Sequence, residues 1–274
     1  MNNLDPNTVN SFGDEWSRFD QSRISFDEAA RLFGDYFDIF PWATLPENSV
    51  GFDMGCGTGR WARFVAPRVG RLHCIEPSLA LDVARRNLSE FKNIEFHCAS
   101  VANSGLPPAS QDFGYCLGVL HHVPDTAAGI SSCAELLKPE APFLIYLYYA
   151  FDKRPLWFRA LWRVSDVMRR VIIRLPAEGK HVVTNVIAAL VYWPFAKASK
   201  FIERFGVNVK GIPLSSYRNC SFYTMCTDSR DRFGTPIEQR FTREQIESMM
   251  RSAGFKNIKF SEKSPYWCAV GIKI

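Results

Sequence analysis

The amino-acid sequence predicts an α/β fold in which helices cover both faces of a mostly parallel sheet. Three observations predict it. Five apolar runs alternate with helix-like patterns between residues 49 and 149. A glycine-rich stretch, DMGCGTGRW, directly follows the first of these runs. Near the C-terminus, an amphipathic segment leads into two further strand-like runs. Strands as apolar as these five are typically buried on both faces, as in a parallel sheet covered by helices.

The individual elements follow from these patterns in chain order. Strands are expected at SVGFDM, RLHCIE, NIEFHCA, DFGYCLGVL and PFLIYLYY. Helices are expected at RWARFVAPRV, SLALDVARRNLSEF and AAGISSCAELLK, with Ser78 as the N-cap of the second. TREQIESMMRSAGF is expected to form a late helix that Thr242 caps at its start and Gly254 at its end. KNIKFSE and YWCAVGIKI then predict a closing hairpin.

Composition and charge are those of a soluble globular protein with one unusual segment. The chain has a net charge of +5, with 47% hydrophobic and 22% charged residues. Residues 151–218 hold 13 Lys and Arg against 4 Asp and Glu, which is +9, and the rest of the chain holds 20 against 24, which is −4. A basic segment is therefore set into a mildly acidic body, and the modest total charge does not indicate a nucleic-acid partner.

Cysteine spacing and the apolar runs bear on metal content and location. The eight cysteines form no CxxC pair, so they predict no metal or redox site and indicate reduced thiols in a cytoplasmic protein. The N-terminal residues lack the features of a signal peptide. The longest apolar run, Val182–Ala196, is interrupted by Thr184, Asn185 and Pro194 and is shorter than the roughly 20 residues that span a bilayer.

The glycine stretch indicates a ligand that touches the backbone. Gly55, Gly57 and Gly59 follow the first strand, where a doubly wound sheet binds its ligand. The third glycine is one residue early for GxGxxG, and Arg60 stands where a dinucleotide site needs glycine, so NAD and FAD are disfavoured. Glu76 ends the second strand, 21 residues after Gly55, where a carboxylate receives ribose hydroxyls. The alternative for Glu76 is a solvated carboxylate.

Together, DMGCGTG, IEP, LPPASQDFGYCLGVLHHVPD, LLKPEAPFLIY and FTREQIESMMRSAGF resemble motifs of the class I S-adenosylmethionine-dependent methyltransferases, of the small-molecule or glycan-modifying type. The resemblance covers residues 49–149 and 241–274, close to half of the chain. It implies a Rossmann-like, seven-stranded, mostly parallel sheet with an antiparallel last strand, helices on both faces and a helical insertion after the fifth strand. The expected division is an N-terminal helical lid (1–48), a cofactor-binding core (49–150), a helical substrate cap (151–240) and a C-terminal part that completes the core (241–274).

The resemblance also implies S-adenosyl-L-methionine as the cofactor and S-adenosyl-L-homocysteine as the product. Asp53 would hold the amino-acid end of the cofactor, and Glu76 would accept hydrogen bonds from the ribose diol. Ser100 stands where the family usually has an acidic residue for the adenine amino group, with the Val101 N–H facing the ring. The full expected cofactor set is Asp53, Gly55, Cys56, Gly57, Gly59, Glu76, Pro77, Ser100, Val101, Leu117 and Gly118.

His121 and His122 are the expected catalytic residues. They follow the fourth strand, at the edge where open α/β sheets bind ligands. Methyl transfer is an in-line displacement that depends mainly on alignment, and a base is needed when the acceptor is a hydroxyl. One histidine, His121 before His122, is therefore a candidate base for O-methylation. The alternative is that the pair only caps the next helix or packs beneath the cofactor.

The basic insertion is expected to contain two helices. RPLWFRALWRVSDVMRRVIIRLP is amphipathic, and VTNVIAALVYWPFAKASKFIERFG is expected to bend or split at Pro194. On the first helix, one side carries Arg159, Arg163, Arg170 and Arg174, and the other carries Trp157, Leu161, Val164, Met168 and Val171. The pair could cap the active site, lie on a membrane surface that presents a lipid-linked or quinone-like acceptor, or form a dimer interface.

The acceptor site is expected to draw on the N-terminal segment, with its aromatic residues at helical spacing, and on the stretch after the helix pair. The candidates are Trp16, Tyr217, Arg218, Tyr223 and Arg240. The alternative for Trp16 is a helix that merely packs on the body of the protein, and for the other four it is an ordinary surface loop. The expected acceptor is a small molecule or sugar, bound by a monomer or homodimer.

An NAD-dependent oxidoreductase and a non-catalytic S-adenosylmethionine-binding protein are the alternative functions. Nucleic-acid methylation is disfavoured because no (D/N)PP(Y/W) motif follows the fourth strand.

Overall fold

The computed structural model describes residues 3–151, 155–209 and 211–274. The chain divides into two compact units. The sheet unit holds Met1–Asp20, Ala29–Asp152 and Ile237–Ile274. The helical unit holds Gln21–Glu28 and Lys153–Pro236, so a short piece of the N-terminal region belongs with the insertion.

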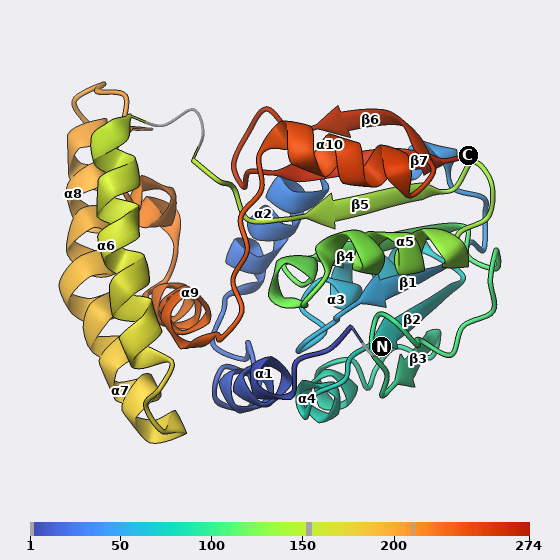
Figure 1. Ribbon diagram of the computed structural model, residues 1–274, viewed down its shortest axis with the longest axis horizontal. Helices are drawn as coiled ribbons and strands as arrows, with labels where there is room; N and C mark the ends of the chain where they lie inside the picture. Colours follow the sequence, from blue (N-terminus) through green and yellow to red (C-terminus); the bar gives the residue numbers. More distant parts are fainter. Residues whose placement is uncertain (1–2, 152–154, 210) are drawn as a thin grey trace. The chain divides into compact units, whose positions relative to one another are not determined.

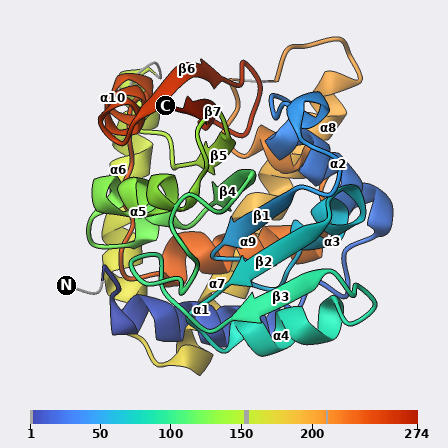
Figure 2. The ribbon, with the colours of Figure 1, turned by 90° about the vertical axis from the view of Figure 1, so that its right-hand side faces the viewer.

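A seven-stranded sheet forms the centre of the sheet unit, with the strand order β3-β2-β1-β4-β5-β7-β6 (Figure 2). Its first five strands pair in parallel, and β7 runs antiparallel to both β5 and β6. This confirms the Rossmann-like sheet and the antiparallel last strand that the sequence predicts. The strands are β1 Val50–Met54, β2 Arg71–Ile75, β3 Ile94–His97, β4 Phe113–Leu117, β5 Pro142–Tyr146, β6 Phe255–Phe260 and β7 Cys268–Lys273.

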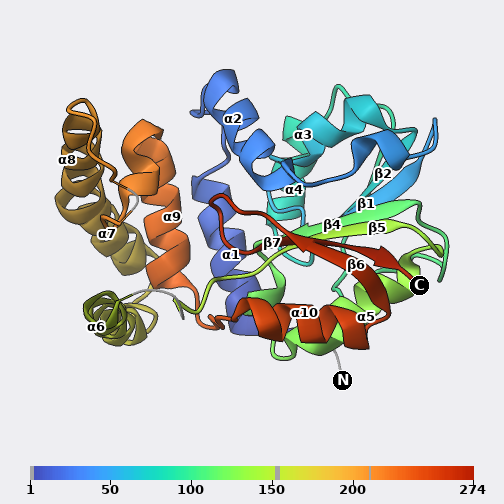
Figure 3. The same cartoon turned by 90° about the horizontal axis from the view of Figure 1, so that it is seen from above.

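Helices cover both faces of this sheet, as expected (Figure 3). The helices α3 (Ala62–Val65) and α4 (Ala80–Asn87), with the later part of α2 (Phe26–Phe37), pack on one face. On the other face lie α5 (Thr126–Leu136) and α10 (Arg243–Ser252). Strand side chains alternate between two apolar clusters, so all of β4 is buried, as the continuous apolar run predicts.

The sequence predicted the bounds of the late helix α10 more accurately than those of the earlier helices α3 and α4. Thr242 caps α10 with a complete capping box, and Gly254, at φ +82°, follows its last turn, as predicted. The first expected helix is reduced to the four residues of α3 followed by a 3₁₀ turn, because Pro67 has no N–H to continue the helix. The N-cap position of α4 falls on Leu79, one residue later than predicted, although the Ser78 hydroxyl accepts a hydrogen bond from the Ala80 N–H at 3.2 Å.

The helical unit contains α6 (Leu156–Ile172), α7 (Ala177–Ile187), α8 (Trp193–Glu203) and α9 (Phe222–Gly234) (Figure 1). The expected irregularity at Pro194 takes the form of a π-helical segment over Ala188–Tyr192, which joins α7 to α8. Tyr223 does not lie in a surface loop, which was the alternative, because it belongs to α9. This helix is capped by Ser221 and has a buried side that includes Met225.

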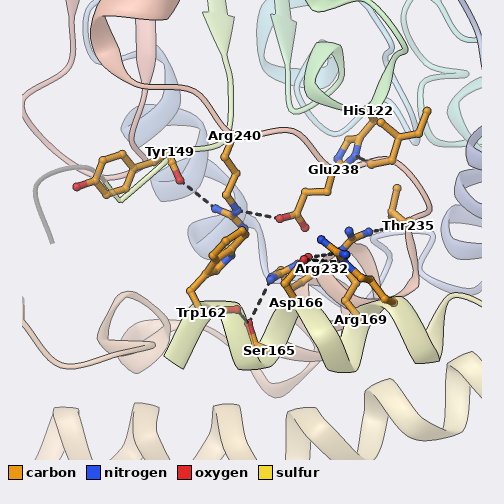
Figure 4. Close-up of polar contacts among 12 residues, drawn as sticks. His122, Tyr149, Trp162, Ser165, Asp166, Arg169, Arg232, Thr235, Glu238 and Arg240 are labelled. Carbon is orange, nitrogen blue, oxygen red and sulfur yellow. Dashed lines mark hydrogen bonds and ion pairs between the residues drawn. The ribbon is translucent and has the colours of Figure 1, made fainter. Parts of the chain in front are cut away.

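Two polar clusters hold the helical unit together. The buried guanidinium of Arg169 donates to Asp166 and to the backbone carbonyls of Thr235 and Pro236 (Figure 4). Burial raises the pKa of Asp166, but the hydrogen bonds and charges of Arg169 and Arg170 outweigh burial, and the pKa is lowered.

The second cluster attaches the short N-terminal piece to α9. The carboxylate of Glu28 accepts hydrogen bonds from the Ser221 N–H, at 2.9 Å, and from the Thr224 hydroxyl, at 2.8 Å. The N–H of Gln21 donates to the Tyr223 hydroxyl at 3.0 Å. These contacts join residues that are 193 to 202 positions apart in the sequence, and they explain why residues 21–28 belong to this unit.

The apolar side of α6 is exposed. Its side chains include Leu156, Trp157, Leu161, Val164, Val167, Met168 and Val171, each about half exposed or more. By length and composition alone, one helical run among the described residues, Ala177–Glu203, could cross a membrane. This run is longer than the apolar stretch Val182–Ala196, which the sequence suggests is too short. A third of its most apolar part is buried, and the core helices of soluble proteins can have the same length and composition.

Candidate functional site

The turn after β1 depends on three glycines. Gly55, Gly57 and Gly59 have φ values of +76°, +54° and +78°, a conformation that L side chains rarely adopt. A Cβ on Gly59 would lie 2.4 Å from the Leu88 side chain, and one on Gly55 would lie 2.5 Å from Val119. The backbone of this turn can therefore take its course only where side chains are absent.

Glu76 joins this turn to the one after β2. Its carboxylate accepts a hydrogen bond from the Gly57 N–H at 3.1 Å and one from the Ser78 N–H at 3.0 Å. The side chain is buried, so the alternative of a solvated carboxylate is wrong. Burial raises the pKa of Glu76, and the hydrogen bonds from Ser78 and Gly57 oppose that rise.

Asp53, on β1, is also buried, and its carboxylate accepts a hydrogen bond from the Tyr115 hydroxyl at 3.0 Å. Burial raises its pKa to about 8. Tyr115 and the charge of Arg60 oppose this rise, and the charge of Glu76 adds to it. Tyr115 was not among the expected site residues. It lies beside Asp53 in the β1–β4 register, so only the pairing of the strands identifies it.

Helix α1 (Pro6–Arg18) lies over both turns. The indole nitrogen of Trp16 is 3.5 Å from the position that a Cβ on Gly57 would take. The corresponding position on Gly13 is 3.5 Å from the backbone nitrogen of Leu79, after β2. The guanidinium of Arg60 lies 5.5 Å from the centre of the Trp16 ring. Trp16 therefore lies beside the glycine turn, as its expected place in the site requires.

The other expected cofactor residues differ in their surroundings. Gly118, at φ +81°, directly follows β4, and the one atom within 4 Å of its Cβ position is a Tyr146 ring carbon at 4.0 Å. There is open space at this point. Ser100 and Pro77 are partly buried. The side chains of Cys56, Val101 and Leu117 belong to the core.

The two histidines after β4 have different surroundings. The His121 ring is fully buried and stacks on Tyr148 with ring centres 3.7 Å apart. Neither of its ring nitrogens has a hydrogen-bond partner among the described residues. Burial, with His122 and Arg240 nearby, holds the pKa of His121 well below its ordinary value. By contrast, Nδ1 of His122 donates to the Ile237 carbonyl at 2.6 Å.

Arg240 lies beside the histidine pair. Its guanidinium donates to Glu238 at 2.8 Å and to the Tyr149 carbonyl at 3.2 Å (Figure 4). It also lies 5.0 Å from the centre of the Tyr148 ring, the ring on which His121 stacks. Tyr148 and Glu238 are residues that sequence reasoning missed. For Tyr148, its position just past the fifth strand is the one feature of the sequence that could have indicated a role in the site.

Three expected acceptor residues belong to the helical unit, where each has partners of its own. The Tyr217 ring lies 5.2 Å from that of Tyr192, and Arg218 donates to Glu203 at 2.8 Å. The hydroxyl of Tyr223 accepts the Gln21 hydrogen bond described above. The structure therefore places Trp16, Arg240 and the histidines in the sheet unit with the strand-end residues, and these three in the helical unit.

The residues of the sheet unit fit a ligand of the expected chemistry. Glu76 offers a fixed carboxylate to vicinal hydroxyls, since each of its oxygens keeps a further lone pair beside its one backbone donor. Asp53 offers a second carboxyl, which a cationic group would favour in its ionised form. The glycine turn lets such a ligand reach the backbone.

Comparison with known proteins agrees with this ligand chemistry. Residues 52–145 match the model of the family described as methyltransferase domain. A ubiquinone biosynthesis O-methyltransferase of Neisseria meningitidis serogroup A is 34% identical over 185 residues, which are 65% of this chain and 72% of that protein. One of Xylella fastidiosa strain M23 is 27% identical over 181 residues, 64% of this chain and 69% of that protein. A solved O-methyltransferase family protein from Burkholderia thailandensis shares the fold, with a TM-score of 0.52 and 13% identity over 89% of this chain and 56% of its own.

Titration of Asp53 predicts a pH-dependent stability. Its pKa is about 8 in the folded protein and 3.8 ordinarily, so the folded state holds a proton that the unfolded chain loses between these values. The stability that this proton provides is therefore lost as the pH rises from about 4 to about 8. Asn cannot titrate, so Asp53→Asn should raise the melting temperature relative to wild type at pH 8 but not at pH 5. A change of a few degrees is expected, since 1 kcal/mol corresponds to about 2–4 °C.

Scanning calorimetry between pH 5 and pH 8 measures this difference. The control is Asp82→Asn, which removes an exposed carboxylate on α4 and should leave the pH dependence as in wild type. Equal pH slopes for wild type and Asp53→Asn would contradict the raised pKa.

Proposed function

This chain belongs to the class I S-adenosylmethionine-dependent methyltransferases, and we propose that it methylates a hydroxyl oxygen of a small-molecule acceptor with His121 as the general base. The observation that carries the proposal is the state of His121. Its ring is buried against Tyr148 and has no hydrogen-bond partner among the described residues. A buried polar group without a partner is costly, and such groups are retained where a ligand uses them.

S-adenosylmethionine supplies an activated methyl group on its sulfonium. In our proposal, Glu76 accepts hydrogen bonds from the two ribose hydroxyls, Asp53 binds the amino-acid end, and the glycine turn contacts the cofactor through its backbone. Trp16 and the rest of α1 close over the turn as a lid and exclude water. The intact set of backbone contacts around Glu76 supports these roles.

His121 would take the proton of the acceptor hydroxyl as the new oxygen–carbon bond forms. Its lowered pKa keeps the imidazole neutral near pH 7, so it can accept a proton without first losing one. Stacking on Tyr148 fixes the plane of the ring. His122, held by the Ile237 carbonyl, would orient its neighbour, and Arg240 would contact the acceptor beside Tyr148.

The acceptor we propose is a hydroxylated, quinone-like ring with an apolar tail, taken from a membrane surface on the cytoplasmic side. The curated relatives named above are ubiquinone biosynthesis enzymes. In the helical unit, α6 exposes a row of apolar side chains, and the segment 151–218 carries a charge of +9. A basic helix with an exposed apolar side is typical of proteins that lie on anionic membranes. We also propose Tyr217, Arg218 and Tyr223, all in the helical unit, as contacts of the acceptor.

Loss of the Glu76 charge should weaken cofactor binding. A hydrogen bond to a charged group contributes about 1.5–3 kcal/mol, so Glu76→Gln should raise the Kd for S-adenosylmethionine by about tenfold to a hundredfold. Isothermal titration calorimetry measures the change. Glu90→Gln, which removes an exposed carboxylate, is the matched control and should bind as wild type does. An unchanged Kd for Glu76→Gln would exclude the role proposed for this carboxylate.

Replacing His121 should affect the chemical step. We expect His121→Gln to lower kcat by about 10²-fold or more on an alkyl-substituted catechol, with little change in the Kd for S-adenosylmethionine. A base acts in its neutral form, so activity is lost as the pH falls through its pKa. Because that pKa is lowered, the wild-type rate should fall only well below pH 6.5, and the variant should lack this fall. His122→Gln should keep it. Full turnover by His121→Gln with an unaltered pH profile would remove His121 from the mechanism.

Membrane binding can be measured by co-sedimentation with vesicles of phosphatidylcholine and phosphatidylglycerol. Burying a Leu or Val side chain contributes about 1.5–3 kcal/mol, so a Leu161→Glu, Val164→Glu double variant should bind at least tenfold more weakly than wild type. Ile274→Glu, an exposed apolar residue of the sheet unit, should bind as wild type does. Wild type that stays in the supernatant, or an equal loss in both variants, would favour a water-soluble acceptor.

A further inference from the structure

Away from the cofactor site, three side chains with metal-binding atoms gather on strands β2 and β3. His73 lies in the middle of β2, and its partner in the parallel register is Glu95 of β3. His97 follows two residues after Glu95, so both point to the same face of the sheet. One ligand atom from each of the three side chains lies within 4.8 Å of the other two.

The distances fit a single ion. Nδ1 of His73 is 3.0 Å from Nε2 of His97 and 3.4 Å from a carboxylate oxygen of Glu95. Two ligand atoms bound to one zinc ion at about 2.0–2.2 Å are about 3–3.6 Å apart. An ion could therefore bind between these atoms with only small side-chain shifts.

The fold leaves this face of the two strands accessible. Residues 98–112, which connect β3 to β4, form no helix, although such a connection in a parallel sheet is usually helical. The edge strand β3 therefore lacks a crossover helix on top of it, and about half of the Glu95 side chain is exposed. His73 is mostly buried and His97 is partly buried, so the site has a firm inner side and an open outer side.

The surrounding groups prepare the three side chains for a cation. Arg71 binds the other oxygen of Glu95 at 3.1 Å and so orients the carboxylate toward His73. Two imidazoles and a carboxylate are a donor set that zinc and related ions prefer over magnesium or calcium.

We propose that His73, Glu95 and His97 form a binding site for a divalent transition-metal ion such as Zn²⁺, which ties the edge strand β3 to β2. Three protein ligands leave a further position for water. The ion would also steady the ends of both strands, since Glu76 directly follows β2 and Ser100 comes shortly after β3. The cysteine spacing that predicts no metal site does not bear on this group, because its ligands come from two separate strands.

The test uses the full-length protein without an affinity tag, first treated with EDTA and then dialysed. Calorimetric titration with ZnCl₂ should give one ion per chain, and ZnCl₂ but not MgCl₂ should raise the melting temperature by several degrees. His97→Gln removes one partly exposed ligand and should raise the Kd for Zn²⁺ at least tenfold. Glu95→Gln should do the same and abolish the thermal shift.

The chain offers a matched control in His181→Gln, which removes a histidine of the helical unit and should bind Zn²⁺ as wild type does. To separate this site from the histidine pair after β4, His121→Gln is titrated as well, and it should also bind Zn²⁺ as wild type does. An unchanged Zn²⁺ affinity in both His97→Gln and Glu95→Gln would overturn the proposal. So would a larger loss in His121→Gln than in His97→Gln. All readouts are independent of methyltransferase activity.

Discussion

The arrangement of the site depends on the buried carboxylate of Glu76 and the two backbone N–H groups that it holds. A buried anion must be hydrogen-bonded, and here the donors come from the turn after β1 and the turn after β2. The glycine turn can present its N–H only because Gly57 adopts a left-handed conformation. Helix α1 then packs on the pair of turns through Trp16 and Gly13. The Glu76 carboxylate thus links the two turns on which helix α1 packs.

Burial controls the charge of the reactive groups around this centre. It raises the pKa of Asp53 and lowers that of His121, so both groups are neutral over part of the range in which an exposed group would be charged. Asp53 lies near the end of β1 and His121 follows β4, and these two strands are neighbours in the sheet. A cofactor with a cationic end would therefore favour the ionised form of Asp53. An acceptor with a hydroxyl group would meet His121 in its neutral form, which can accept a proton.

The helical unit departs from the usual distribution of side chains in a globular protein. Arg169 and Asp166 are buried and bonded inside it, whereas Trp157, Leu161 and Val164 are exposed on α6. Exposed apolar rows of this length usually mark a surface that binds something. The positive charge of the same segment favours an anionic partner. The two features together favour a membrane surface over a purely structural insertion.

The sequence by itself determined the strands, the parallel sheet, the glycine turn and the role of Thr242, because apolar periodicity, glycine spacing and cap residues act within a few neighbouring positions. Only the tertiary structure decided that Tyr115 binds Asp53, that Tyr148 stacks on His121, that Gln21–Glu28 joins α9, and that His73 meets His97. The partners in these pairs are separated by between 24 and 202 residues. Strand register and helix packing bring them together, and no local pattern in the chain encodes either of these.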